Sequence, residues 1–181
     1  MCKPQEKTDW ERCVEFHGHS CPGLAIGYRA AQAVRKKLNV RFSPDEEMVC
    51  VTENDACGVD AVQVLTGCSI GKGNLIYHDT GKQAFSFYSR KDGRKVRLVF
   101  KKHLKRDENW DMAAMEKMIL EAPEEDLFNF TEPADPPPAK ARIFTSVDCD
   151  ACGESAAENR IRLHDGRKVC LSCFPEYSRG W

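Results

Sequence analysis

Two pairs of cysteines near the C-terminal end constrain the fold of this 181-residue chain more than any other feature. Cys149 and Cys152 form the first CxxC pair, Cys170 and Cys173 form the second, and residues 153–169 separate them. This spacing is typical of a four-cysteine zinc site. Four thiolates fill the tetrahedral shell of zinc and leave no position for water, so the pattern predicts a structural zinc ion.

The segment between the two cysteine pairs predicts a small hairpin. Residues 160–164 and 167–169 are strand-like and flank Asp165-Gly166, a dipeptide typical of a tight turn. The order of a CxxC pair, a hairpin and a second CxxC pair resembles a treble-clef zinc finger. Because so small a module buries little apolar area, we expect the metal to supply much of its folding free energy. Its nearly balanced charge favours contact with protein over DNA.

A proline-rich stretch precedes this finger. Residues 132–140 read Glu-Pro-Ala-Asp-Pro-Pro-Pro-Ala-Lys, a composition that predicts an extended, semi-rigid spacer of about 3 Å per residue. We therefore divide the chain into a core domain of residues 1–131, a linker of residues 132–142 and a zinc finger of residues 143–181. Such a linker can carry the finger onto its own core or onto a partner subunit, and the sequence leaves both open.

Composition limits the class of protein. The chain is 41% hydrophobic and 30% charged, which supports a real core, and its formal net charge of −1 argues against a protein devoted to nucleic acid. No apolar run is long enough to span a membrane, and the first residues lack the core of a signal peptide, so we expect a cytoplasmic location. Ten cysteines in such a chain indicate metal ligands or redox groups rather than disulfides.

The core domain contains a stretch in which two imidazoles and a thiol alternate: His17, His19 and Cys21. Pro22 follows, and proline is favoured at the first position of a helix. Cys21 is therefore expected at a helix N-terminus, where the helix dipole favours the thiolate that attacks electrophiles and binds metals.

A short helix is expected just before this stretch. Thr8 and Glu11 fit a capping box, and apolar residues then recur at helical spacing. This helix should deliver His17 toward the interior, while Cys13 is best interpreted as a small buried hydrophobe.

Residues 22–38 predict a second, slender helix. Glycine inside a helix costs about 1 kcal/mol relative to alanine, so Gly23 and Gly27 indicate a close approach by another backbone. We expect this helix to be central, packed on a sheet or on a symmetry mate. Residues 48–52 are short, apolar and β-rich, which predicts an inner strand.

A third helix is expected after this strand, capped by Asn54 or Asp55 and ended by Gly67. Cys57 then lies near its start and Cys68 just past its end. A helix between them would hold the two sulfurs about 16 Å apart. Both can bind one ion only if the helix is shorter or bends back.

The following segments predict strands over residues 75–78, 83–90 and 94–101, joined by turns that suit an antiparallel meander. Their alternating apolar side chains should face the helices. A further helix is expected at about residues 110–121. The fold class is thus α+β, with an antiparallel or mixed sheet packed with helices.

Charge is distributed unevenly around these strands. A basic hairpin comprises Arg90, Lys91, Arg94, Lys95, Arg97, Lys101, Lys102, Lys105 and Arg106. An acidic segment follows, with Asp107, Glu108, Asp111, Glu116, Glu121, Glu124, Glu125 and Asp126. Two solvated faces that partly neutralise each other, a pairing of these charges across a dimer, and an RNA site are all consistent with this pattern.

A second candidate site combines nitrogen and sulfur ligands: His17, His19, Cys21, Cys57 and Cys68. Such a set suits zinc, iron, nickel or copper. Three ligands and an open position would allow the ion to polarise a carbonyl or activate water. If instead two cysteines approach each other, thiol–disulfide chemistry follows. Simple packing of these residues is the alternative. Lys72, in a glycine-rich turn, can face an anionic group beside Cys68.

Three motifs carry a resemblance to a known family. Residues 16–23 read Phe-His-Gly-His-Ser-Cys-Pro-Gly, residues 57–63 read Cys-Gly-Val-Asp-Ala-Val-Gln, and residues 66–75 read Thr-Gly-Cys-Ser-Ile-Gly-Lys-Gly-Asn-Leu. Over roughly residues 10–130, the chain resembles the family of the E subunit of formylmethanofuran dehydrogenase. A zinc-finger tail like residues 145–181 is similar to that of some members.

The resemblance implies an α+β core, often dimeric, with a metal site lined by the motif residues. The family takes its name from a molybdenum or tungsten enzyme that reduces carbon dioxide to a formyl group on methanofuran. Carried over position by position, the resemblance implies metal ligands at His19, Cys21, Cys57 and Cys68, with Asp60, Gln63 and Lys72 nearby.

We therefore expect a cytoplasmic, homodimeric metalloprotein. It would act as an accessory subunit of a larger redox complex, or as a small metal-dependent enzyme, in one-carbon or redox metabolism. Nothing in the chain resembles a pterin-binding catalytic subunit, so any redox role would be accessory or use the chain's own metal. The alternative is a non-enzymatic metal sensor or adaptor that contacts a partner through its zinc finger.

Overall fold

The computed structural model describes residues 6–101 and 111–176. The chain divides into two compact units, Met1–Ala141 and Arg142–Trp181. No helix among the residues that the structure describes combines the length and the apolar character that crossing a membrane requires.

Two helices open the first unit, α1 (Asp9–His17) and α2 (Pro22–Lys37). The capping box predicted at the start of α1 is confirmed, because the Thr8 hydroxyl accepts from the Glu11 N–H and the Glu11 carboxylate accepts from the Thr8 N–H. Cys21 is the N-cap of α2, with its sulfur accepting from the Leu24 N–H at 3.3 Å. The sequence therefore placed both helix starts correctly.

Helix α2 packs closely on α3 (Gly58–Thr66). A Cβ atom added at Gly27 would lie 1.9 Å from the carbonyl oxygen of Gly58, so only glycine allows this crossing. The close backbone approach predicted from the glycines of α2 is thus confirmed. The predicted N-cap of α3, Asn54 or Asp55, is wrong: Cys57 is the N-cap, and the Asn54 side chain accepts from the Ala56 N–H in the preceding loop. Gly67 ends the helix in the left-handed conformation, as expected.

The sheet of the first unit has five strands in the order β2-β1-β3-β4-β5. Their bounds are Leu75–Tyr77 for β2, Met48–Thr52 for β1, Ala84–Ser89 for β3, Lys95–Phe100 for β4 and Phe128–Thr131 for β5. β2 runs parallel to β1, and the remaining neighbours are antiparallel. The sheet is therefore mixed.

The predicted meander is wrong for β2, which pairs with β1 rather than with β3. The chain leaves β1, passes through α3 and returns beside β1 as a parallel strand, which requires such a crossover. Asn74, just before β2, holds β2 beside β1, because its side-chain amide donates to the carbonyls of Asp45 at 3.0 Å and Met48 at 2.9 Å. β1 is then free to pair with β3 on its other side.

Two short helices, α4 (Met112–Glu121) and α5 (Glu124–Leu127), lead into β5. Trp110, where a helix was expected to begin, lies outside the described residues. The Arg29 guanidinium of α2 donates to the carbonyls of Ile119, Leu120 and Ala122 and so fixes the end of α4. The sequence did not predict β5.

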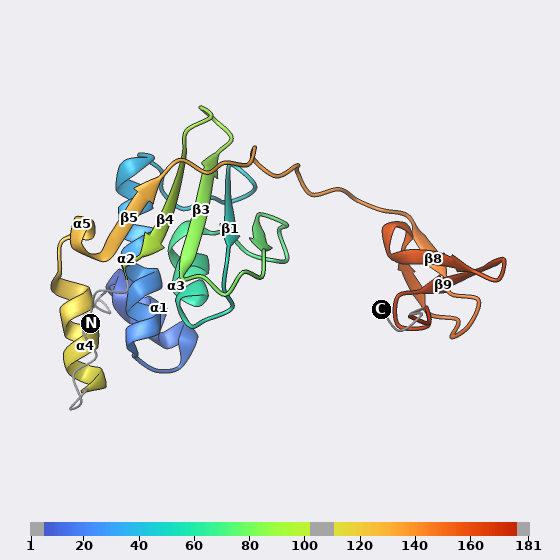
Figure 1. Cartoon of the computed structure of the whole chain (residues 1–181), viewed down its shortest axis with the longest axis horizontal. Coiled ribbons are helices and arrows are strands. Elements are labelled where there is room, and N and C mark those ends of the chain that lie inside the picture. Colours follow the sequence, from blue (N-terminus) through green and yellow to red (C-terminus); the bar gives the residue numbers. More distant parts are fainter. Residues whose placement is uncertain (1–5, 102–110, 177–181) are drawn as a thin grey trace, which may run out of the picture. The chain divides into compact units, whose positions relative to one another are not determined.

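The core lies between the helices and one face of the sheet (Figure 1). Phe85 and Phe87 of β3 and Val96 and Leu98 of β4 are buried in a cluster with the apolar face of α2. Their predicted orientation toward the helices is confirmed. Cys13 is fully buried, also as predicted.

The opposite face of the sheet is crossed by residues 132–141, here called the strap. The Lys95 ammonium donates to the Pro133 carbonyl at 3.2 Å, the Tyr88 hydroxyl donates to the Asp135 carbonyl at 3.4 Å, and the Ala141 N–H donates to the Glu46 carboxylate at 3.1 Å. In Figure 1 this orange segment passes over β4, β3 and β1. The stretch expected as a spacer is therefore held on the first unit.

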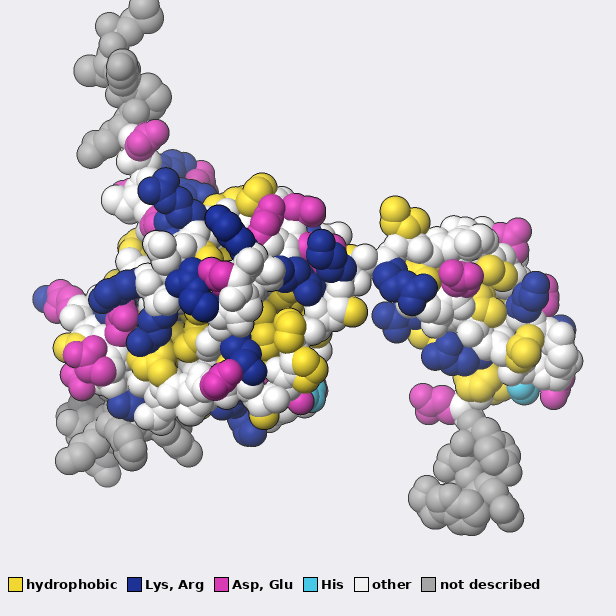
Figure 2. Space-filling model, turned by 90° about the horizontal axis from the view of Figure 1, so that it is seen from above, with side chains coloured by type: hydrophobic (Ala, Val, Ile, Leu, Met, Phe, Trp, Pro, Cys, Tyr) yellow, Lys and Arg dark blue, Asp and Glu magenta, His cyan; other side chains and the backbone are white. Residues whose placement is uncertain are grey.

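Four of the six basic hairpin residues that the structure describes form ion pairs within the first unit. The ion pairs are Arg90 with Glu46 at 3.8 Å, Arg94 with Asp92 at 2.6 Å, Lys95 with Glu132 at 3.1 Å, and Arg97 with Glu53 at 2.6 Å. None of these acidic partners belongs to the segment that follows the hairpin. Figure 2 accordingly shows basic and acidic side chains interspersed on the visible face. The charged residues Lys102, Lys105, Arg106, Asp107 and Glu108 lie outside the described part.

The second unit consists of two small hairpins. β6 (Ser146–Asp148) pairs with β7 (Ser155–Ala157), a single 3-10 turn covers Glu158–Arg160, and β8 (Ile161–His164) pairs with β9 (Arg167–Cys170). Asp165 and Gly166 both have positive φ, the conformation that a tight two-residue hairpin turn requires. The hairpin predicted between the cysteine pairs is confirmed.

Candidate metal centre

Three potential metal ligands meet where α1 ends and where α2 and α3 begin. His17 is the last residue of α1, Cys21 caps α2 and Cys57 caps α3. One ligand atom from each lies within 4.8 Å of the other two. Gly18, in the left-handed conformation at φ 90°, turns the chain between α1 and α2. The tight contact of α2 with α3 brings Cys57 to the other two.

His17 is oriented as a metal ligand would be. Its Nδ1 lies 2.7 Å from an Asp60 carboxylate oxygen, a contact between the end of α1 and the first turn of α3. Its Nε2 is buried and makes no hydrogen bond with any residue that the structure describes. Metal-ligating histidines use one ring nitrogen on the metal and the other on a carboxylate, so this unpaired nitrogen fits the donor set.

The two cysteines complete the cluster. Both are half-buried, and burial together with a hydrogen bond to Cys21 raises the pKa of the Cys57 thiol. One imidazole and two thiols form a donor set that zinc and other transition metals accept. Three protein ligands leave the fourth position of a tetrahedral ion open, unlike a structural four-cysteine site.

Other residues expected at this site lie at different distances from it. His19 is exposed, with its ring 4.5 Å from that of His17 between centroids. The Gln63 amide donates to the second Asp60 carboxylate oxygen at 3.4 Å. The structure therefore gathers His17, Cys21, Cys57, Asp60 and Gln63, with His19 beside them.

Cys68 and Lys72 lie at the far end of α3. The Cys68 thiol is buried, donates to the Met48 carbonyl at 3.7 Å, and has a pKa raised to about 11 by burial. The Lys72 ammonium donates to the Ser43 carbonyl at 2.8 Å. Since α3 is a regular helix between Cys57 and Cys68, the structure does not bring these two sulfurs together.

The residue pattern offered both His17 and His19 as ligands and the resemblance implied His19, whereas the structure places His17 with the two cysteines. The signal was present in the sequence, because helical spacing directs His17 toward the interior. What the sequence could not supply was the contact with Asp60, forty-three positions away.

A cavity of about 560 Å³ lies between α1 and the C-terminal part of α3, and none of His17, Cys21 and Cys57 lines it. Gln63 and Lys72 line it, together with the exposed rings of Phe16 and Phe42. Gln63 connects the cavity wall to Asp60 and, through Asp60, to His17. Two residues that the resemblance placed near the site therefore share this cavity, and of the two it is Gln63 that is linked to the cluster, through Asp60.

The second unit contains the other cluster. One sulfur from each of Cys149, Cys152, Cys170 and Cys173 lies within 4.8 Å of the others. Backbone N–H groups, that of Cys152 foremost, lower the pKa of the Cys149 thiol to about 6. The Cys170 N–H donates to the Cys149 sulfur at 3.3 Å. Donors of this kind stabilise the thiolate that zinc requires.

An α+β core with a histidine–cysteine cluster, joined to a four-cysteine finger, defines a metal-binding protein. Residues 16–135 match the family described as "FmdE, Molybdenum formylmethanofuran dehydrogenase operon". Residues 142–179 match the prokaryotic dksA/traR C4-type zinc finger. The chain belongs to the FmdE family and has a C-terminal zinc finger of the C4 type, as the sequence motifs predicted.

Two known proteins are similar to this chain. A protein of Archaeoglobus fulgidus named "Probable S-adenosyl-L-methionine-binding protein" is 33% identical over 199 residues, which cover 92% of this chain and 52% of that protein. The chain thus spans about half the length of this curated relative. The crystal structure of a "tungsten formylmethanofuran dehydrogenase subunit e (fmde)-like protein" from Syntrophus aciditrophicus superposes with a TM-score of 0.64. It is 24% identical, with 90% of this chain and 88% of that chain covered, and it supports the fold.

Proposed function

We propose that the first unit binds a transition-metal ion through His17, Cys21 and Cys57, and that the protein works as a small metalloenzyme or an accessory subunit in one-carbon or redox metabolism. The observation that carries this proposal is the buried Nε2 of His17, which lacks a hydrogen-bond partner among the described residues and lies beside two thiols. When bound, an ion in this site would supply Lewis-acid or redox chemistry to a substrate.

The residues of the chain have separate roles in this proposal. Asp60 holds the His17 ring in one tautomer and orientation, and Gln63 holds Asp60. His19 is exposed beside the cluster, where it can move a proton to or from a bound substrate. Cys21 and Cys57 would hold the ion as thiolates. Because His19 is exposed, a substrate would approach the cluster from its side.

The cellular setting is part of the same proposal. We infer a cytoplasmic homodimer that works alone or within a larger redox complex, with the zinc finger as a structural module that contacts protein. If a formylmethanofuran dehydrogenase complex lacking this chain kept full activity, the subunit version of the proposal would be abandoned.

The metal content of the chain tests the core site. The protein is purified anaerobically without chelator, and metal per chain is measured for wild type, Cys57→Ser and Cys68→Ser. We expect two metals in wild type and Cys68→Ser, and one zinc in Cys57→Ser. One zinc in all three proteins would confine metal to the finger and contradict the proposal. The identity of the second metal would choose between Lewis-acid and redox chemistry.

A non-enzymatic sensor or adaptor is the alternative function, since the finger is a separate compact unit. In this case the core ion would bind reversibly and change the affinity of the protein for a partner without turnover of any substrate. A pull-down from cell extract at two metal concentrations, followed by an activity screen, distinguishes the two. Metal-dependent capture without turnover would favour the sensor.

A further inference from the structure

A second cavity, of about 690 Å³, lies on the other side of the sheet from the helices, beneath the strap. One rung of the sheet, meaning a row of residues that are paired across neighbouring strands, lines the floor of the cavity. The outward side chains of Ile76, Val51, Ser86, Arg97 and Thr131 follow one another across β2, β1, β3, β4 and β5. The strap forms the opposite wall through Glu132, Pro133, Ala134, Asp135, Pro136 and Pro138.

Ser86 creates the hollow at the centre of this floor. It is the smallest side chain of the rung and lies between Val51 and Arg97. Its hydroxyl makes no hydrogen bond with another side chain or backbone group in the described part of the chain. The strap is fastened to Lys95 on β4 and to Glu46 just before β1, and the cavity lies beneath it.

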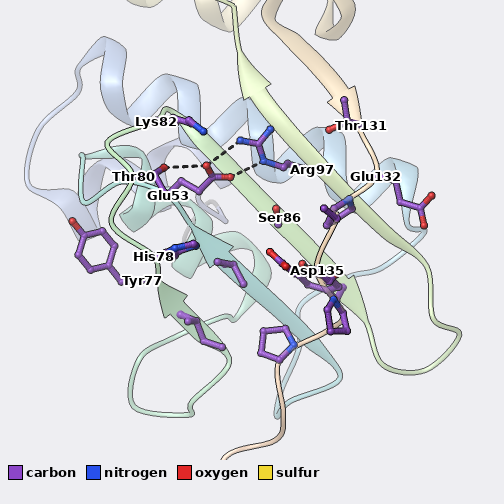
Figure 3. Close-up of a pocket in the computed structure, with 17 residues that line it drawn as sticks. Glu53, Tyr77, His78, Thr80, Lys82, Ser86, Arg97, Thr131, Glu132 and Asp135 are labelled. Carbon is purple, nitrogen blue, oxygen red and sulfur yellow. Dashed lines mark hydrogen bonds and ion pairs between the residues drawn. The ribbon is translucent and has the colours of Figure 1, made fainter.

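Positive charge is in excess at one end of the cavity. Arg97 donates twice to the Glu53 carboxylate, at 2.6 and 2.9 Å, and Thr80 donates once at 3.0 Å. The Lys82 ammonium points toward the same carboxylate (Figure 3). One buried carboxylate is therefore faced by two cations, which leaves a net positive charge for a ligand to neutralise.

Negative charge is in excess on the strap side. The Asp135 carboxylate points over the floor toward Ser86 (Figure 3). Within the described residues no lysine, arginine or histidine nitrogen lies within 4.0 Å of it. The nearby Lys95 ammonium is already held by Glu132 at 3.1 Å and by the Pro133 carbonyl. The Tyr88 hydroxyl bonds the Asp135 carbonyl and fixes this part of the strap.

We propose that this cavity binds a zwitterionic small molecule of the α-amino acid type. Its carboxylate would lie at Lys82 and Arg97, and its ammonium group at Asp135, above Ser86. A cavity of about 690 Å³ is larger than an amino acid backbone needs and falls in the range of ligand pockets. The ligand therefore carries a sizeable side group, which Ile76, Val51 and the strap prolines would contact.

This site is independent of the proposed metal centre. The ligands His17, Cys21 and Cys57 belong to the helical layer, whereas the cavity faces the strap on the opposite side of the sheet. Failure of the metal proposal would leave it unaffected. Since amino acids also chelate metal ions, the test must separate the two sites.

Calorimetric titration of the whole chain provides the test. The probes are L-phenylalanine and L-tryptophan, each compared with the amine that lacks its carboxylate, phenethylamine or tryptamine, and with the acid that lacks its ammonium, phenylpropionate or indolepropionate. We expect at least one amino acid to bind, and its two analogues to bind about tenfold more weakly or worse, because each loses a charged hydrogen bond.

Variants locate the site. Asp135→Asn and Lys82→Gln should each weaken binding about tenfold. The matched changes Asp126→Asn and Lys117→Gln lie outside the cavity and should leave binding unchanged. Cys57→Ser should also bind normally. A thermal unfolding curve for each variant shows that it is folded.

Several results would overturn the proposal. It is wrong if neither amino acid binds, if an analogue binds as well as its parent, or if the two cavity variants bind like their matched controls. Loss of binding in Cys57→Ser would assign the ligand to the metal centre instead and would equally contradict it.

Discussion

At the residue scale, the contact between Asp60 and His17 orients the core cluster. We expect Asp60→Asn to lower the affinity for the core metal by about 10- to 100-fold, the usual effect of losing a carboxylate that orients a histidine ligand. Competition with a chromophoric chelator measures this affinity. The zinc of the four-cysteine finger should be unaffected and serves as an internal reference.

Asp55→Asn is the matched control, because Asp55 is exposed in the loop just before Cys57 and does not contact His17. If both variants lose core metal equally, or neither does, Asp60 has no special role in holding His17.

The ion pair of Glu53 with Arg97 makes stability depend on pH. Hydrogen bonds from Arg97 lower the pKa of the Glu53 carboxyl in the folded chain. The ionised carboxylate therefore stabilises the fold above its unfolded pKa of about 4.3, and this stabilisation is lost as the pH falls through the lower, folded value. Glu53→Gln should lower the free energy of unfolding at pH 7 by about 1–3 kcal/mol, because it leaves Arg97 without its partner.

Urea unfolding at several pH values between 3 and 7 measures this effect. The difference between wild type and Glu53→Gln should shrink at the acidic end. A difference that is constant with pH would mean that the ion pair is not the cause. Glu125→Gln, an exposed change on α5, is the control.

The sequence predicted which residue types form the site, but it did not predict all of the residues that they contact. Local signals located Cys21 at the start of a helix and directed His17 inward, because capping and helical periodicity act over a few residues. The Asp60 contact and the Glu53–Arg97 pair join residues more than forty positions apart. Only the packing of the elements brings such residues together, so spacing alone could not reveal them.

At the scale of elements, the crossing of α2 and α3 brings Cys21 near Cys57. Alanine is normally preferred over glycine in a helix by about 1 kcal/mol. At Gly27, however, a Cβ would meet the Gly58 backbone at 1.9 Å. We therefore expect Gly27→Ala to destabilise the first unit by about 1–3 kcal/mol, as overpacking does.

Chemical denaturation measures the loss, and metal content shows whether the cluster survives. Gly71→Ala is the control, since a Cβ there meets nothing within 4 Å and its φ is not positive. An unchanged or raised stability of Gly27→Ala would show that the two helices can separate at little cost.

The helices and strands also show which features of the fold local sequence patterns predict and which they miss. Caps and alternation identified α1, α2, β1, β3 and β4, each from its own residues. The partner of β2 was missed because pairing depends on the crossover through α3, which no local pattern records. β5 was missed because it is only four residues long and follows a short helix, so little periodicity is available.

At the scale of the whole molecule, the two units should respond differently to loss of metal. The first unit has a continuous hydrophobic core between α2 and the sheet, which does not depend on an ion. In the second unit, Cys149 and Val169 are the only buried hydrophobic residues among those described, so its fold depends on the four cysteines.

Chelation should therefore unfold residues 142–176 while the first unit stays folded. Limited proteolysis followed by mass spectrometry is the measurement. With chelator, or in Cys149→Ser, we expect rapid cleavage within the finger and a resistant fragment that ends near Ala141, where the strap is still bonded to Glu46. Cys57→Ser without chelator is the matched control and should leave the finger protected, because its zinc is untouched. If the first unit were digested together with the finger, its fold would depend on metal as well, and the core ion would be structural rather than a centre with an open position.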